Sequence, residues 1–301
     1  MINLFITYNQ LDLKTSQKIK LFDSLISPIL NYSAGIWGYC SSKEIENVHT
    51  KFCRKLLHVK KSTNLNALYG ELGRVPMFIQ RKVILIKYWA KIISKPNTSI
   101  LYNTYEMLKL DVDNGSTDSN NWAYQIKLIL DRIGLGNIWL MQQASSTTLQ
   151  LIKRRILDNY YQTWYANINN SPKLESYCIF KHKFEFEKYL DNINDKKLRI
   201  NLTKFRLSSH DLYIEVGRYN NIPRDQRICQ NCSMNVPETE YHFLLVCEKY
   251  RNLRMKFFKR YYCRWPSLNK FEKLLCHQSN IVIRNIANYI FSANKIRRQL
   301  N

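Results

Sequence analysis

The sequence has few of the residues that interrupt regular structure, and it lacks the long apolar runs that a membrane requires. Only 8 glycines and 7 prolines occur in 301 residues, which favours a helical chain because both residues punctuate secondary structure. No stretch reaches the roughly 18 consecutive apolar residues of a membrane-spanning helix. The first residues have neither the basic start nor the long apolar run of a secretory signal peptide. We therefore expect an intracellular protein, in the nucleus or the cytoplasm, with reduced cysteines.

Acidic side chains are also scarce. The chain carries 23 Asp and Glu against 46 Lys and Arg, a formal net charge of +23. The surplus lies towards both ends: residues 1–95 hold 15 basic and 5 acidic side chains, and residues 229–301 hold 13 and 4. Such a surplus indicates an anionic partner, and the alternative is a basic surface that is merely well solvated. We expect the partner to be a nucleic acid, with neither a membrane nor a small-molecule substrate involved.

Apolar residues recur at helical spacing along most of the chain, which predicts a mostly α protein. Ser41 and Glu44 form a capping box that predicts the start of one helix. Residues 64–73 are typical of a short helix closed by glycine, and residues 76–93 of a longer one that ends before Pro96. Residues 212–216 alternate between apolar and polar types, which suggests a short strand.

The strongest local motif is Cys229-x2-Cys232-x9-His242-x4-Cys247. Two cysteines separated by two residues present their sulfurs to one point, and His242 and Cys247 complete a tetrahedral set. Three thiolates and one imidazole suit Zn²⁺, and a site with four protein ligands is structural because no position remains for a reactive water. We therefore predict one structural Zn²⁺. The alternative is that the thiols are packed separately and the histidine lies at the surface.

Basic and aromatic side chains surround this motif. Cations attract phosphates and aromatic rings stack on bases, which is the combination used to bind single-stranded nucleic acids. In the alternative, the tyrosines form a small core and the charges are solvated. The predicted nucleic-acid-binding residues near the motif are Arg218, Tyr219, Arg224, Arg227, Lys249, Arg251 and Arg254, and those on one face of the helix after Ser41 are Lys51, Arg54 and Lys55.

Two parts of the chain resemble the C-terminal end of non-LTR (LINE-type) retrotransposon reverse transcriptases. The first resembles the segment that follows the polymerase palm, and the second resembles the C-terminal zinc-binding region. The first part is carried by residues 21–32, Gly35-Ile-Trp37-Gly38, Lys51-Phe-Cys-Arg54, Ala67-Leu and Glu71-Leu-Gly73. The second is carried by residues 206–212, Ile214-Glu-Val-Gly-Arg218, Arg227-x-Cys-x2-Cys232, His242-Phe-Leu-Leu-x-Cys247, Tyr250 and Arg254.

The resemblance implies a non-catalytic fragment of an RNA-directed DNA polymerase. It assigns the zinc ligands to the same four residues, Cys229, Cys232, His242 and Cys247. Polymerases hold two metal ions with paired aspartates, but this sequence contains no Asp-Asp pair, so we expect no enzyme activity. After Cys247 the only acidic residues are Glu248 and Glu272, too few for a nuclease metal site.

The expected organisation is a helical bundle similar to a reverse-transcriptase thumb at residues 1–95, followed by a helical connector at 96–210. A CCHC zinc-knuckle region at 211–262 and a C-terminal helical tail at 263–301 complete the chain. The expected function is binding of RNA or DNA. The alternatives are a zinc-stabilised protein-interaction module and a non-functional, truncated retroelement product. Catalysis would require a palm supplied by another chain.

Overall fold

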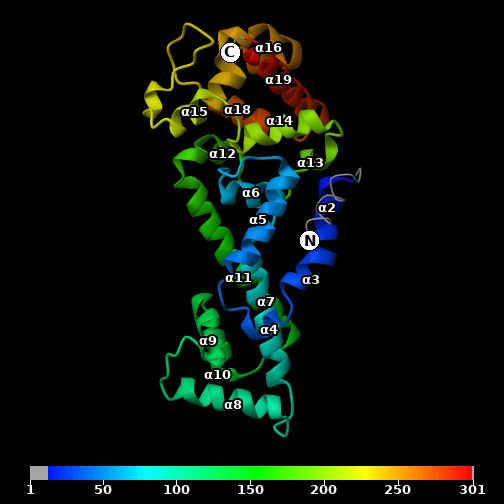
Figure 1. The fold of residues 1–301 in the computed structure, drawn as a ribbon, viewed down its shortest axis with the longest axis vertical. Coiled ribbons are helices and arrows are strands. Elements are labelled where there is room, and N and C mark those ends of the chain that lie inside the picture. Colours follow the sequence, from blue (N-terminus) through cyan, green and yellow to red (C-terminus); the bar gives the residue numbers. More distant parts are fainter. Residues whose placement is uncertain (1–12, 300–301) are drawn as a thin grey trace. The chain divides into compact units, whose positions relative to one another are not determined.

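The structure, a computed structural model, describes residues 13–299 and is mostly helical (Figure 1). Helices make up 69% of it and the described residues contain no strand, only isolated bridges between Leu72 and Phe186 and between Ile228 and Pro237. The mostly α fold predicted from the sequence is thus confirmed. None of the described helices combines the length and the hydrophobicity that crossing a membrane would require.

The chain divides into two compact units, and both are discontinuous in sequence. Of the described residues, the first unit comprises 13–20, 50–74 and 166–299, and the second comprises 21–49 and 75–165. Helices α5 (Lys43–Leu57) and α11 (Ser146–Asn169) each contribute to both units. This division differs from the four contiguous segments expected above, because helices far apart in the sequence share one core.

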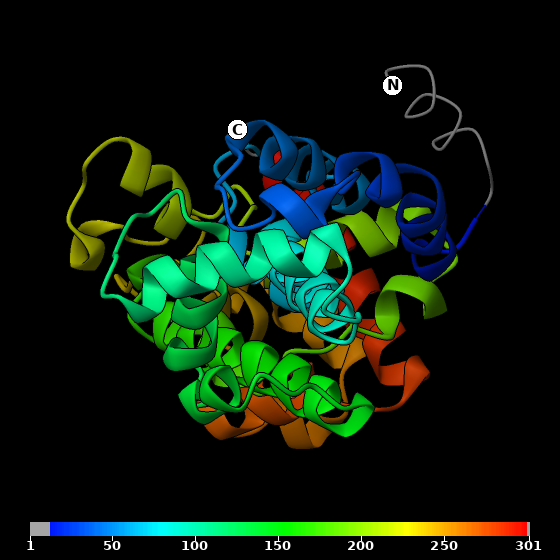
Figure 2. The ribbon, with the colours of Figure 1, turned by 90° about the horizontal axis from the view of Figure 1, so that it is seen from below.

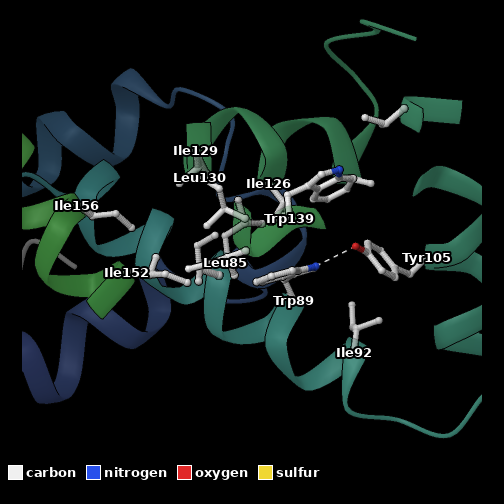
Figure 3. Packing of buried hydrophobic residues seen from close by; sticks show 14 of the residues in the cluster. Leu85, Trp89, Ile92, Tyr105, Ile126, Ile129, Leu130, Trp139, Ile152 and Ile156 are labelled. Carbon is white, nitrogen blue, oxygen red and sulfur yellow. Dashed lines mark hydrogen bonds between the residues drawn. The ribbon is translucent and has the colours of Figure 1, made fainter. Parts of the chain in front are cut away.

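The second unit is built around helix α7. In Figure 2, α7 is seen nearly end-on and α8 lies across it. The buried core joins α7, α8, α9, α10 and α11, and Figure 3 shows Trp89 donating a hydrogen bond of 3.0 Å from Nε1 to the Tyr105 hydroxyl inside it. The helices of this unit, besides parts of α5 and α11, are η1 (Phe22–Ile26), α3 (Ser27–Leu30), α4 (Ala34–Trp37), α7 (Met77–Ile93), α8 (Ile100–Asp113), α9 (Trp122–Arg132) and α10 (Gly136–Met141).

The first unit contains the C-terminal half of the chain, where α14 and α16 both pack against the long helix α19 (Figure 1). Phe243 lies in its core, with ring centroids 5.9 Å from Phe205 of α14 and 5.9 Å from Tyr289 of α19. The helices before α14 are α2 (Thr15–Leu21), α6 (Leu65–Leu72), η2 (Pro172–Leu174), α12 (Glu175–Phe180) and α13 (Tyr189–Asn192). From α14 onwards they are α14 (Lys196–Arg206), α15 (Tyr213–Tyr219), η3 (Arg224–Gln226), η4 (His242–Val246), η5 (Glu248–Tyr250), α16 (Arg251–Phe257), α17 (Arg260–Cys263), α18 (Leu268–Leu275) and α19 (Asn280–Arg298).

Local signals located two helices well. Asn64 caps α6 by accepting a hydrogen bond from the Asn66 amide, and Gly73 ends it at φ 57°. A β-carbon on Gly73 would lie 2.3 Å from the Phe186 nitrogen, so only glycine fits there. Helix α7 spans Met77–Ile93, as predicted.

Two local expectations need correction. Helix α5 begins at Lys43, and the hydroxyl that accepts a hydrogen bond from a first-turn amide belongs to Ser42, not Ser41. The predicted strand at 212–216 is wrong, because Tyr213–Tyr219 forms helix α15. The carboxylate of Glu238, far along the chain, accepts a hydrogen bond from the Tyr213 amide at the start of this helix, a tertiary cap that the local pattern does not reveal.

Candidate metal centre

Four side chains of the first unit converge on one point. The ligand atoms of Cys229, Cys232, His242 and Cys247 all lie within 4.8 Å of one another. The Sγ atoms of Cys229 and Cys247 are 4.0 Å apart, and Cys232 Sγ is 3.4 Å from His242 Nε2. Tetrahedral zinc with Zn–S near 2.3 Å requires sulfur–sulfur separations of about 3.8 Å. The cluster therefore has the dimensions of a metal site.

A narrow hairpin positions the first two ligands. The Cys229 amide donates to the Val236 carbonyl at 2.9 Å, and the Glu238 amide donates to the Arg227 carbonyl at 2.9 Å. These bonds close residues 227–238 into a loop that carries Cys229 and Cys232 on one turn. Asn235, in the left-handed region at φ 51°, allows the return.

The other two ligands lie at either end of the single helical turn η4. His242 begins this turn and Cys247 follows it, with the Cys247 amide donating to the His242 carbonyl at 2.8 Å. Cys229, His242 and Cys247 are buried, and Cys232 is half-buried. A largely buried donor set of this kind suits a structural site more than an exchanging one.

The thiols of the cluster are electrostatically linked. A hydrogen bond with Cys247, together with burial, raises the pKa of Cys229 to about 12. The same hydrogen bond lowers the pKa of Cys247. Metal binding requires deprotonated thiols, so loading this site releases protons and is favoured by rising pH.

Glu238 contacts the metal-ligand loop without being a ligand, and it was not among the site residues predicted from the sequence. Its side chain is 1% exposed. Its Oε1 accepts a hydrogen bond from Asn231 Nδ2 at 3.2 Å and pairs with Arg297 of helix α19. One carboxylate thus joins the cysteine loop to α19 and to the start of α15, and such outer contacts hold metal ligands in place.

A second carboxylate anchors the segment before His242. Glu240 is buried, and it accepts hydrogen bonds from Ser176 Oγ at 2.7 Å and from Ser208 Oγ at 2.9 Å. His210 Nε2 lies 2.9 Å from the same carboxylate. Since His210 Nδ1 accepts a hydrogen bond from the Leu212 amide, Nε2 carries the proton that is shared with Glu240. This network connects Ser208 and His210 to the segment that precedes the ligand His242.

The structure leaves several of the predicted nucleic-acid contacts at the surface. Lys249, Arg251, Lys51 and Lys55 are exposed, and so is half of the Tyr219 side chain. The Arg218 guanidinium lies 4.9 Å from the centre of the Tyr219 ring. Arg218 also pairs with Glu215 at 3.1 Å, and Arg224 pairs with Glu175 at 2.5 Å, so both are partly neutralised.

Three other predicted contacts have roles inside the fold. Arg254 is 5% exposed and donates a hydrogen bond to the Val246 carbonyl at 3.2 Å. The prediction that Arg254 lies on the binding surface is therefore wrong. Arg227 donates to the carbonyls of Ile222 and Ile214, at 2.9 and 2.8 Å. Arg54 is half-buried and reaches the Thr63 carbonyl at 3.5 Å. A basic residue in a charged segment can donate hydrogen bonds to backbone carbonyl groups instead of contacting a ligand. The sequence pattern does not distinguish these two roles.

The fold and the site together define a class: a mostly helical protein with a buried Cys₃His cluster that could hold a metal ion. Comparisons of the chain with protein-family models, with curated proteins and with solved structures found no match.

Proposed function

We propose that this protein binds RNA or DNA and that its Cys₃His cluster holds one structural Zn²⁺. The convergence of Cys229, Cys232, His242 and Cys247 within 4.8 Å is the observation that carries the proposal. Three thiolates and one imidazole form a donor set that selects Zn²⁺ over hard cations such as Mg²⁺, and four protein ligands leave no open position.

Charge supports the nucleic-acid part of the proposal. Between Glu248 and Glu272 the chain has eight basic residues and no acidic one. This segment begins next to the ligand Cys247, and α16 packs against the helical turns on either side of that residue. A cationic surface of this kind attracts a phosphate backbone over long range.

The retroelement resemblance belongs to the same proposal. Its two regions contribute structural parts to the fold: Gly73 ends α6, and residues 206–212 hold the Glu240 carboxylate. We propose a polymerase-derived binding protein, with residues 1–95 related to a thumb and residues 211–262 to a zinc knuckle. We expect neither polymerase nor nuclease activity in assays of the full chain.

Metal analysis of the purified full-length protein tests the zinc site. We expect about one equivalent of zinc per chain, and its loss in a Cys232→Ser variant. Cys40→Ser is the matched control, because Cys40 is an exposed thiol outside the cluster. Full zinc retention in Cys232→Ser, or no metal in the wild type, would overturn the assignment.

Salt titration of oligonucleotide binding tests the partner. The logarithm of the association constant should fall linearly with the logarithm of the salt concentration, with a slope that grows with the number of phosphates neutralised. An absence of oligonucleotide binding at low salt would refute the proposal. Salt-independent capture of a protein partner would instead support the alternative, a zinc-stabilised interaction module.

A further inference from the structure

One tryptophan of the first unit projects into solvent. The chain has six tryptophans. Trp89, Trp139 and Trp164 are buried, Trp37 and Trp122 are half-buried, and Trp265 is 78% exposed. Among residues 13–299, no hydrogen bond or ring contact holds the Trp265 indole. A large aromatic ring in this position contributes little to the fold.

The backbone at Trp265 is also strained. Its φ is 52°, in the left-handed region. Bulky side chains rarely adopt this conformation, and the following Pro266 restricts Trp265 further. Strained residues persist where the surroundings fix them, and they cluster at functional sites.

Neighbouring contacts fix the loop that carries Trp265. Lys270 Nζ donates a hydrogen bond to the Arg264 carbonyl, and the Ser267 hydroxyl accepts one from the Lys270 amide at 3.3 Å. The same ammonium lies 4.7 Å from the centre of the Tyr261 ring, which is itself 53% exposed. Two exposed aromatic side chains therefore border one loop that is tied to the start of α18.

The segment that carries this loop is cationic. The loop lies within the segment between Glu248 and Glu272, which contains no acidic residue. Exposed apolar side chains are fewer here than exposed cations, which favours a polyanion over an apolar protein surface. The exposed cations of this segment are Lys249, Arg251, Lys256, Lys259, Arg260 and Arg264.

We propose that Trp265 and Tyr261 form a stacking site for unpaired bases of a single-stranded nucleic acid, whose phosphates contact exposed cations of the same segment. This inference rests on the proposed function and specifies its ligand. Single strands are favoured because the bases of a duplex are already stacked, whereas an unpaired base offers a free ring face. The indole supplies the platform and the cations supply the sequence-independent attraction.

Trp265→Ala in the full-length protein tests the proposal. Stacking on one aromatic side chain corresponds to about a 5- to 150-fold change in affinity. We expect a loss of that size for a fluorescein-labelled oligouridylate or oligothymidylate, rescue in Trp265→Phe, and little change for a DNA hairpin duplex. Comparison of the two single strands distinguishes RNA from DNA. Tyr32→Ala is the matched control, because Tyr32 is 79% exposed in the second unit.

Tryptophan fluorescence provides an independent readout. Trp265 contributes the most solvent-exposed emission, so oligouridylate should quench that emission in the wild type and not in Trp265→Phe. Unchanged single-strand affinity in Trp265→Ala would overturn the stacking site while leaving nucleic-acid binding intact. Absence of oligonucleotide binding by the wild type would refute both proposals. Trp265-dependent binding to vesicles of phosphatidylserine, without single-strand binding, would replace this proposal with a lipid surface.

Discussion

The two units are both helical, yet they bury different kinds of side chain. The core of the second unit consists of aliphatic and aromatic residues such as Leu85, Trp89 and Ile126, all fully buried. Its buried cation is Arg81, which pairs with Glu46 at 3.1 Å and lies 5.6 Å from the centre of the Trp37 ring. Hydrophobic burial, which is non-directional, accounts for most of this core, and the Arg81–Glu46 pair is its main charged contact.

The first unit buries a network of charges as well as apolar side chains. Arg206 is 4% exposed, and its guanidinium pairs with Glu71 at 2.6 Å and with Glu187 at 3.1 Å. Lys181 pairs with the same Glu187, and Tyr189 donates a hydrogen bond to Glu71 at 2.7 Å. Burying charges costs desolvation free energy, and the loss of any one partner leaves a buried charge without compensation. The first unit therefore depends on specific partners, as its metal ligands also do.

The largest expected effect comes from removing one partner of that network. Arg206→Met leaves the Glu71 carboxylate buried without its cation, which should lower the free energy of unfolding by about 3–5 kcal/mol. Urea denaturation measures the loss, and hydrogen exchange of peptides from each unit locates it in the first unit. Arg154→Met is the control, since the Arg154–Asp158 pair is exposed at the surface, and it should change stability by less than about 0.5 kcal/mol. Equal losses in both variants would contradict the comparison.

A cavity in the second unit should have the next largest effect. Leu85 is fully buried, and Leu85→Ala should cost about 2–5 kcal/mol through lost burial and the void left behind. Hydrogen exchange should increase in α7 and α9 rather than in α14 and α19. Leu140→Ala, at an 81% exposed position of the same unit, is the control and should be nearly silent. Faster exchange in the first unit would show that the units do not have separate cores.

Acid should weaken the first unit through His58. Burial, followed by repulsion from Lys196, Arg199, Lys18 and Lys204, lowers the pKa of His58 from 6.5 to about 4. The unfolded chain therefore binds a proton at a higher pH than the folded chain, so stability falls as the pH drops from 6.5 towards 4. The half-buried position limits this loss to about 1–2 kcal/mol.

His58→Asn should remove that part of the pH dependence. His58 has a φ of 53°, and asparagine tolerates this left-handed conformation better than most residues. Melting temperatures of the two proteins between pH 4 and 7 give the measurement. A constant difference across this range would show that His58 does not titrate in the fold.

The smallest effect concerns exposed charge. Arg251 is exposed in the first unit, and Arg251→Ala should reduce the logarithmic salt slope of oligonucleotide binding by about 1 without lowering stability. Arg254→Ala should instead destabilise the protein, because Arg254 is buried. Arg154→Ala, in the second unit, should alter neither property. An equal change of the salt slope in Arg154→Ala and Arg251→Ala would show that the binding surface is not confined to the first unit.

Short-range features of the fold were predictable from the sequence. The ligand set Cys229, Cys232, His242 and Cys247 spans few residues, so its spacing already indicates a shared centre. The cap and the glycine that bound α6 follow from local backbone chemistry. A signal for Glu238 was present as well, because it is an acidic residue within the cysteine loop of a strongly basic chain.

Long-range features were not predictable from these patterns. Helix α15 forms where alternation suggested a strand, since its cap is supplied by Glu238. Arg254 and Arg227 lie in the same kind of basic, aromatic sequence as Arg251. In the fold, however, both donate hydrogen bonds to backbone carbonyl groups. Nothing in the sequence marks Trp265 as exposed and left-handed, because both properties depend on what packs around it.

The amino-acid sequence by itself determined a basic, helical chain and a local group of three thiols and one imidazole, because periodicity and short spacing act within a few turns. Only the tertiary structure decided which charges are buried, which segments share a core and which aromatic ring remains in solvent. The physical reason is that burial and ion pairing depend on contacts between residues more than a hundred positions apart, such as Arg206 and Glu71.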